Sequence, residues 1–201
     1  MDHFITLNEN QNTKTMKTRF LMILVLVIAS TTFAQTEVAG IELPDTFQVG
    51  ETELSLNGAG VREKFWMDMY AGGLYTSQKM SDAQKVMDAD APMVIKLHIV
   101  SGLISSDKMS SAVEEGFENS TNGNTKPYRA KIDKFISFFS DEITKNDVFD
   151  ITYTPLDGVV VFKNGEELGS IKGADFKKAL FGIWFCNKPA DKDLMKGMLG
   201  Q

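Results

Sequence analysis

One arginine in this sequence follows a glycine-rich segment and precedes a run of large apolar side chains. Arg62 comes directly after Asn57-Gly58-Ala59-Gly60-Val61, and the apolar residues that follow it are Phe65, Trp66, Met67, Met69, Tyr70, Leu74 and Tyr75. A guanidinium buried among such side chains must be paired, because an isolated buried charge costs several kcal/mol. A bound carboxylate or phenolate would pair it through charge-assisted hydrogen bonds, and an internal Asp or Glu would do so equally well. A solvated surface charge is the third interpretation that the residues alone leave open.

Other signatures of catalysis are missing from the sequence. It contains no phosphate loop, CxxC pair, HExxH motif or GxSxG turn, and Glu63 stands where a dinucleotide fingerprint beginning at Gly58 needs its third glycine. Of the two histidines, His3 lies near the N-terminus, and His98 shares a predicted strand face with Lys96, where we expect it to be solvated. Because metal sites and histidine bases need clustered partners, we expect no metal and no cofactor.

The first 34 residues have the layout of a secretory signal peptide. Lys17 and Arg19 form a basic start, residues 20–29 form an apolar run, and small residues up to Ala34 supply a cleavage site. The apolar run is too short for a membrane anchor, because a spanning helix needs about twenty such residues. We therefore predict export, to the periplasm or outside the cell, with no integral membrane span after cleavage.

Met16 is an alternative start, which would make residues 1–15 an upstream extension. Residues 35–201 have the size of one ordinary domain and contain no linker-like segment. The net charge of −6 comes from scattered acidic residues. Nucleic-acid-binding proteins show a basic footprint instead, so a nucleic-acid partner is not expected. Cys186 is the only cysteine, which excludes an intramolecular disulfide.

A hairpin turn is predicted at Asn57-Gly58, because this dipeptide suits the two positions of positive φ in a tight turn. The strand before it covers residues 52–56, where apolar and polar residues alternate, and the second strand runs over residues 61–75. Gly72-Gly73 interrupts this second strand, which indicates a bulge or a close approach of another backbone.

Periodicity, together with capping and turn signals, predicts the remaining elements. Helices are expected from Ser81, over 105–119, from Pro127, and over 175–185 and 191–199; strands are expected over 93–99, 149–153, 159–162 and 168–171. Strands, helices, strands and helices follow one another, which is an α+β order. Such an order predicts an antiparallel sheet with helices packed on one face.

Three segments in this order resemble the chalcone isomerase-like family. They are Asn57-Gly58-Ala59-Gly60-Val61-Arg62, Gly73-Leu74-Tyr75, and Phe181-Gly182-Ile183-Trp184 followed by Pro189. The resemblance extends from Ile41 to Gly200. It implies an open-faced β-sandwich, in which a large antiparallel sheet is covered on one face by a layer of helices.

The resemblance also implies a role for Arg62. In plant-type isomerases of this family an arginine stabilises a phenolate during ring closure, and in fatty-acid-binding members it meets the lipid carboxylate. Arg62 matches that arginine, and Tyr70 falls on a family threonine. Met109 and Gly116 fall on the tyrosine and asparagine of the true isomerases. Losing positioned polar groups of this kind costs about 10²–10⁴ in rate, so chalcone isomerase activity is not expected.

The predicted function is that of an exported module that binds a fatty acid or similar amphipathic carboxylate. Arg62 is its anion anchor, and Trp66, Tyr70, Tyr75 and Met109 are the other predicted ligand-binding residues. The first alternative is an isomerase (intramolecular lyase) acting on a small unsaturated substrate, with Arg62 and Tyr70 as catalytic residues. The second is a structural or partner-binding envelope protein, in which Arg62 belongs to an internal ion pair.

Overall fold

The computed structural model describes residues 36–201, and residues 35–201 form a compact unit of their own. The predicted signal peptide, including the alternative start at Met16, lies outside the described residues. In the part of the chain that the structure describes, no helix is long and apolar enough to cross a membrane.

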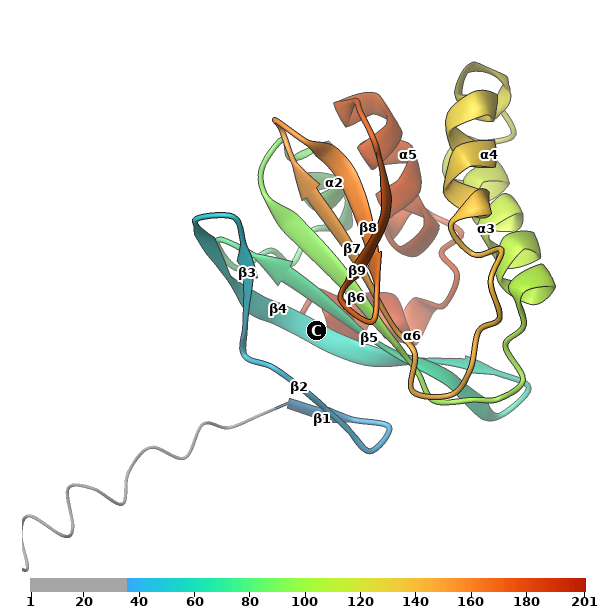
Figure 1. Ribbon diagram of the computed structural model, residues 1–201. Helices are drawn as coiled ribbons and strands as arrows, with labels where there is room; N and C mark the ends of the chain where they lie inside the picture. The colour runs from blue at the N-terminus through green and yellow to red at the C-terminus, as the bar shows by residue number, and fades with distance from the viewer. Residues whose placement is uncertain (1–35) are drawn as a thin grey trace, which may run out of the picture. The chain divides into compact units, whose positions relative to one another are not determined.

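Seven antiparallel strands form one curled sheet in the order of the sequence (Figure 1). They are β3 (Thr46–Val49), β4 (Thr52–Lys64), β5 (Met67–Thr76), β6 (Met93–Ile99), β7 (Val148–Thr154), β8 (Gly158–Lys163) and β9 (Glu166–Ile171). A separate two-stranded ribbon, β1 (Thr36–Val38) and β2 (Ile41–Leu43), precedes the sheet. Every pairing is antiparallel, as the predicted element order requires.

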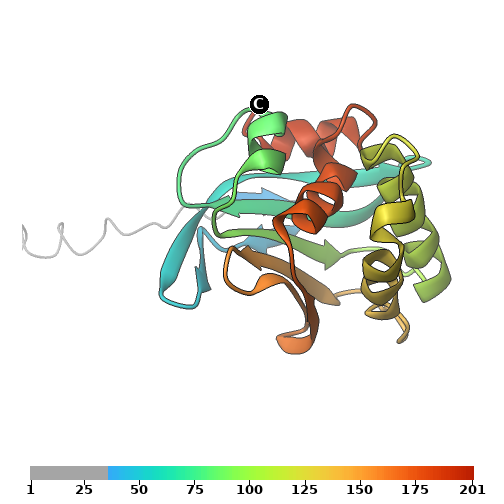
Figure 2. The same cartoon turned by 90° about the horizontal axis from the view of Figure 1, so that it is seen from above.

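The helices pack on one face of this sheet, which confirms the predicted open-faced α+β architecture. They are α2 (Ala83–Asp88), α3 (Ser106–Ser120), the 3-10 turn η1 (Lys126–Tyr128), α4 (Arg129–Ser137), α5 (Ala174–Phe185) and α6 (Lys192–Met198). Figure 2 shows α3 beside α4, with α2, α5 and α6 grouped next to them. The interface between helices and sheet is filled by aromatic rings, among them Phe117, Phe135, Phe139, Phe149 and Phe176.

The predicted hairpin turn at Asn57-Gly58 is wrong. Strand β4 runs without a break through these residues, and the chain turns eight residues later at Phe65 and Trp66, whose φ angles are +53° and +60°. Only a shift of register between Leu56 and Gly58 marks the Asn57 position, which is therefore a β-bulge.

Packing of α6 explains why glycines stand in the middle of β4. A Cβ on Gly58 would clash with the carbonyl oxygen of Gly197 and would lie 2.8 Å from the backbone nitrogen of Gly200. Asn57 fixes the same contact, because its side-chain amide donates to the carbonyl of Met198 at 2.7 Å. The glycines serve a close approach of helix to strand, and not a reversal of the chain.

A close approach also accounts for Gly72 in β5, where the sequence left a bulge as the alternative. A Cβ on Gly72 would lie 2.8 Å from the Met198 side chain and 2.9 Å from that of Leu194, both on α6. The pairing of β5 with β6 continues through Gly72 and Gly73 without a shift of register.

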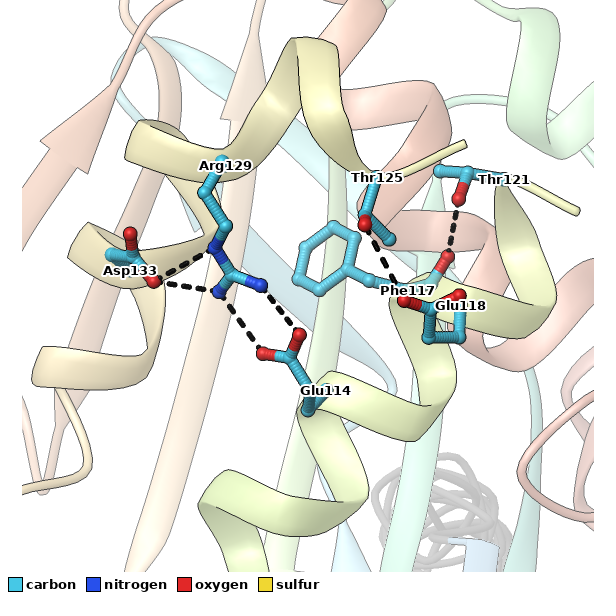
Figure 3. A network of polar contacts seen from close by, with 7 residues as sticks. All are labelled: Glu114, Phe117, Glu118, Thr121, Thr125, Arg129 and Asp133. Atoms are coloured by element: carbon cyan, nitrogen blue, oxygen red, sulfur yellow. Dashed lines mark hydrogen bonds and ion pairs between the residues drawn. The ribbon is translucent and has the colours of Figure 1, made fainter. Parts of the chain in front are cut away.

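Helices α3 and α4 are joined by a polar network on their outer side (Figure 3). Arg129 donates to Glu114 of α3 at 3.0 Å and, through Nε, to Asp133 one turn along α4 at 2.9 Å. These side chains are partly exposed, and exposed ion pairs contribute at most about 1 kcal/mol. The network thus orients α3, while the aromatic core beneath supplies most of the stability.

Candidate functional site

Arg62 and Tyr70 are direct partners across β4 and β5, on the face that the helices cover. The Arg62 guanidinium carbon lies 5.8 Å from the centre of the Tyr70 ring. Behind this pair, Nε1 of Trp184 on α5 donates a hydrogen bond to the Tyr70 hydroxyl at 3.0 Å. Strand register and helix packing together therefore hold the tyrosine that supports the arginine.

Tyr70 is buried, and this burial raises the pKa of its hydroxyl above the ordinary value, although the positive charge of Arg62 opposes the shift. The hydroxyl accepts its hydrogen bond from Trp184, and the Arg62 guanidinium lies beside the ring. At neutral pH Tyr70 is therefore a neutral phenol, whose oxygen accepts a hydrogen bond from Trp184. It can position the guanidinium, but it cannot serve as a base.

Arg62 has no carboxylate partner among residues 36–201. It forms no ion pair there, and its Nε is buried without a hydrogen-bond acceptor. Asp191 lies near Tyr70 and tends to raise the pKa of that hydroxyl, but its oxygens accept from the backbone nitrogens of Asp193, Leu194 and Glu63 at 2.8–3.2 Å. Asp191 thus caps α6 and leaves the guanidinium available.

A cavity of about 260 Å³ opens beside Arg62, between the β4–β5 end of the sheet and the first half of α3. Its lining consists of Arg62, Lys64, Met69, Leu103, Ile104, Asp107, Lys108, Met109, Ser111, Ala112 and Glu115. Three of these side chains are cationic and two are anionic, so the lining carries a small positive excess. Sites for drug-sized ligands usually measure about 300–1,000 Å³, so this cavity suits a head group with a short apolar segment.

The structure brings three of the five predicted site residues together. Arg62 and Met109 line the cavity, and Tyr70 lies behind Arg62. Tyr75 belongs to a small core on the opposite face, where its hydroxyl donates to the carbonyl of Pro44 at 2.9 Å. Trp66 is 95% exposed at the β4–β5 turn and is not part of the cavity lining.

Most other residues of the site were not identified from the sequence, and four of them show why. Lys64, Ile104 and Lys108 line the cavity, and Trp184 holds Tyr70. Lys64 lies two residues beyond Arg62 in β4, so strand periodicity was a usable signal for it. Trp184 is 114 residues away from Tyr70, and no local pattern connects the two.

Two larger depressions lie elsewhere, and neither contains Arg62. One of about 820 Å³ is lined mainly by polar residues around the end of α3, and one of about 520 Å³ lies on the open face of the sheet beside β3. Within residues 36–201, no three His, Cys, Asp or Glu side chains gather as a metal site would require.

The class of fold and site is defined by an antiparallel sheet with helices on one face and by an arginine of β4 beneath those helices. The profile of chalcone isomerase-like proteins matches residues 35–200, and the chain belongs to this family. A solved fatty-acid binding protein of Arabidopsis thaliana is similar in structure, with a TM-score of 0.62 and 21% identity. The match covers 80% of this chain and 92% of that protein, and at this identity it shows a common fold. No curated protein sequence matches the chain.

Proposed function

We propose that the chain is an exported binding protein for a fatty acid or a similar amphipathic carboxylate, with Arg62 as its anion anchor. The observation that carries this proposal is the half-buried guanidinium of Arg62, which has no carboxylate partner among the described residues and borders a cavity. A ligand carboxylate would satisfy the buried Nε and compensate the charge, through the bidentate geometry that suits guanidinium best.

The chemistry of the cavity walls supports an amphipathic ligand. Met69, Ile104 and Met109 are buried apolar side chains that line the cavity next to Arg62. Methionine adapts its shape to irregular apolar partners, such as an acyl chain. A fatty-acid binding protein of the same fold is consistent with this use of the site.

The filled aromatic core limits how an acyl chain would lie. Phe117, Phe149 and Phe176 fill the interior between the sheet and the helices, and none of them lines the cavity. A carboxylate at Arg62 would therefore direct the rest of its chain along Met109 and Leu103, towards the mouth of the cavity. This geometry favours a ligand whose far end remains near the surface.

Isomerase activity has less support from the geometry. Catalysis would need a proton donor beside the bound oxygen, whereas the Tyr70 oxygen is engaged by Trp184 and is not part of the cavity lining. Gly116, at the place of a family asparagine, packs against Ile183: a Cβ there would lie 2.8 Å from that side chain. The α3–α5 contact thus leaves no room for a catalytic side chain at this position.

The remaining alternative is a structural protein in which Arg62 forms an internal ion pair. No carboxylate among residues 36–201 forms such a pair with Arg62. Export is part of the proposal because residues 1–34 combine a basic start, an apolar run and a small-residue cleavage site. It predicts a protein found in the periplasm or secreted.

Extraction of co-purified lipid tests the proposal. Residues 35–201 would be purified as wild type, Arg62→Ala and Arg129→Ala, and an organic extract of each would be quantified by mass spectrometry. Arg129 is a matched control because it is an arginine outside the cavity, in the α3–α4 network. Fatty acid is expected in the wild type and Arg129→Ala and not in Arg62→Ala. Equal amounts of lipid in all three folded proteins would contradict the role of Arg62.

A further inference from the structure

Exposed apolar side chains gather at one end of the molecule. Five large hydrophobic side chains are exposed in the described part of the chain, and four of them, Phe65, Trp66, Met67 and Leu103, lie at the β4–β5 turn or in the loop that follows β6. The backbone nitrogens of Val100 and Ser101 in this loop donate to the Met69 carbonyl at 3.0 and 3.2 Å, which ties the loop to the base of the turn. These four residues are called the apolar tip below.

The fifth exposed residue, Leu156, lies at the other end of the sheet. It occupies the turn between β7 and β8, and the antiparallel pairings of β5 with β6 and of β6 with β7 place that turn opposite the β4–β5 turn (Figure 1). The concentration of apolar side chains at the tip is therefore a local feature, and Leu156 provides a matched control for it.

The backbone of the tip is unfavourable for the residues that occupy it. Phe65 and Trp66 both have positive φ, a region that large L-residues rarely adopt and that asparagine and glycine occupy at little cost. Both side chains point into solvent, with 72% and 95% of their surface exposed, so packing does not repay the strain. Strained residues without a structural benefit indicate a function at that place.

Charges around the tip nearly cancel. Lys64 and Lys108 are accompanied by Glu63, Asp68 and Asp107, all of them exposed. A surface with this balance gains little from an anionic partner, so attraction to the tip must come from its apolar groups.

We propose that the apolar tip docks the protein onto the interfacial region of a lipid bilayer. Tryptophan prefers this region because its ring is apolar and its N–H is polar, and Lys64, whose Nζ lies 5.8 Å from the Phe65 ring centre, can extend towards the head groups. Hot-spot aromatics of protein interfaces fill closely packed pockets. Here the two rings project from a two-residue turn, and such a shape suits insertion between lipid molecules, which can rearrange around the rings.

The position of the cavity links this surface to ligand exchange, an argument that rests on the proposed function. Leu103 belongs to the tip and also lines the cavity, and Lys64, next to Phe65, lines the cavity as well. A fatty acid in the leaflet that the tip enters would therefore lie next to the mouth of the cavity. Docking gives the carrier a route from membrane to Arg62 that avoids free ligand in water.

Vesicle binding tests the docking surface without any fatty acid. Residues 35–201 would be used, so that the apolar run of the leader does not contribute, with phosphatidylcholine vesicles and sedimentation as the assay. We expect Phe65→Ser/Trp66→Ser to weaken binding about 10-fold or more, because two large apolar side chains are lost, and Leu156→Ser to leave it unchanged. Added phosphatidylglycerol or salt should change binding less than about twofold.

Tryptophan fluorescence gives a second readout. Of the two tryptophans Trp184 is buried, so a blue shift on adding vesicles reports insertion of Trp66. No blue shift, or equal vesicle binding by the Phe65→Ser/Trp66→Ser protein, would overturn the proposal. A self-association that needs Trp66, without vesicle binding, would assign the tip to a second copy of the chain and would overturn it as well.

The two proposals fail independently. Equilibrium affinity for palmitate without vesicles should be unchanged in Phe65→Ser/Trp66→Ser, while the rate of palmitate transfer from vesicles should fall about 10-fold, in proportion to the weaker docking. Arg62→Ala should bind vesicles like the wild type. Intact vesicle binding with no palmitate affinity in any protein would remove the fatty-acid function and leave the docking surface.

Discussion

Two segments of the β4–β5 hairpin contrast in residue type and conformation. Asn57-Gly58, with the residues typical of a tight turn, lies in the middle of a strand under α6, whereas Phe65-Trp66, with residues typical of a strand, forms the turn. The first pair is explained by packing, because α6 approaches the backbone too closely for a side chain. The second pair has no packing explanation, and its exposed rings are explained by a surface role.

The contrast shows how one signal can have two causes. Glycine permits positive φ, and it also permits close approach of another backbone. The sequence near Gly58 does not distinguish these causes, because the helix that makes the approach begins more than 130 residues later, at Lys192. Only the tertiary packing of α6 shows that close approach, and not positive φ, is the cause at Gly58.

The largest effect is expected where the α6 contact is closest. Gly58→Ala would place a methyl group against the backbone of Gly197 and Gly200, neither of which can move aside as a side chain would. We expect the free energy of unfolding to fall by about 3 kcal/mol, at the upper end for overpacking. Urea denaturation of residues 35–201 measures it.

Gly102→Ala is the matched control, because nothing lies within 4 Å of a Cβ at Gly102. Its stability should stay within about 1 kcal/mol of the wild type. If both substitutions had the same small effect, the close approach of α6 to β4 would not explain the glycines of this strand.

A smaller effect, of opposite sign, is expected at the tip. Phe65→Asn/Trp66→Gly supplies the residues that a turn with two positive φ angles prefers and removes side chains that pack on nothing. Stability should rise by about 1 kcal/mol, because the strain of L-residues in this region is relieved. Thermal unfolding and vesicle sedimentation on the same samples would show whether stability increases while docking is lost. A destabilised double mutant would mean that the aromatic rings support the fold.

The fold was predictable because apolar residues recur at every second position in the strands and about every 3.6 residues in the helices. The antiparallel sheet, its helix layer and the helices that contain Met109 and Trp184 follow from this periodicity. The turn was misplaced because Asn57 bonds to Met198, 141 residues away, and such a contact leaves no local trace.

Part of the candidate site was indicated by the family resemblance and not by periodicity. Arg62, Tyr70 and Met109 come together as expected from family resemblance. Tyr75 lies on the opposite face because it is an odd number of residues from Tyr70, a rule that strand alternation already contains. The prediction that Trp66 binds the ligand placed this residue within a strand. Because the turn lies at Phe65-Trp66 instead, the Trp66 side chain is exposed.

Recognition of a carboxylate by Arg62 can be tested with two ligands that differ only in the head group. Calorimetry would measure the affinity of residues 35–201 for a fatty acid and for the alcohol of the same chain length, in the wild type and in Arg62→Ala. The wild type should prefer the acid by about 10-fold or more, the contribution of one hydrogen bond to a charged group, and Arg62→Ala should show no preference. Equal preference for the acid in both folded proteins would show that Arg62 does not recognise the carboxylate.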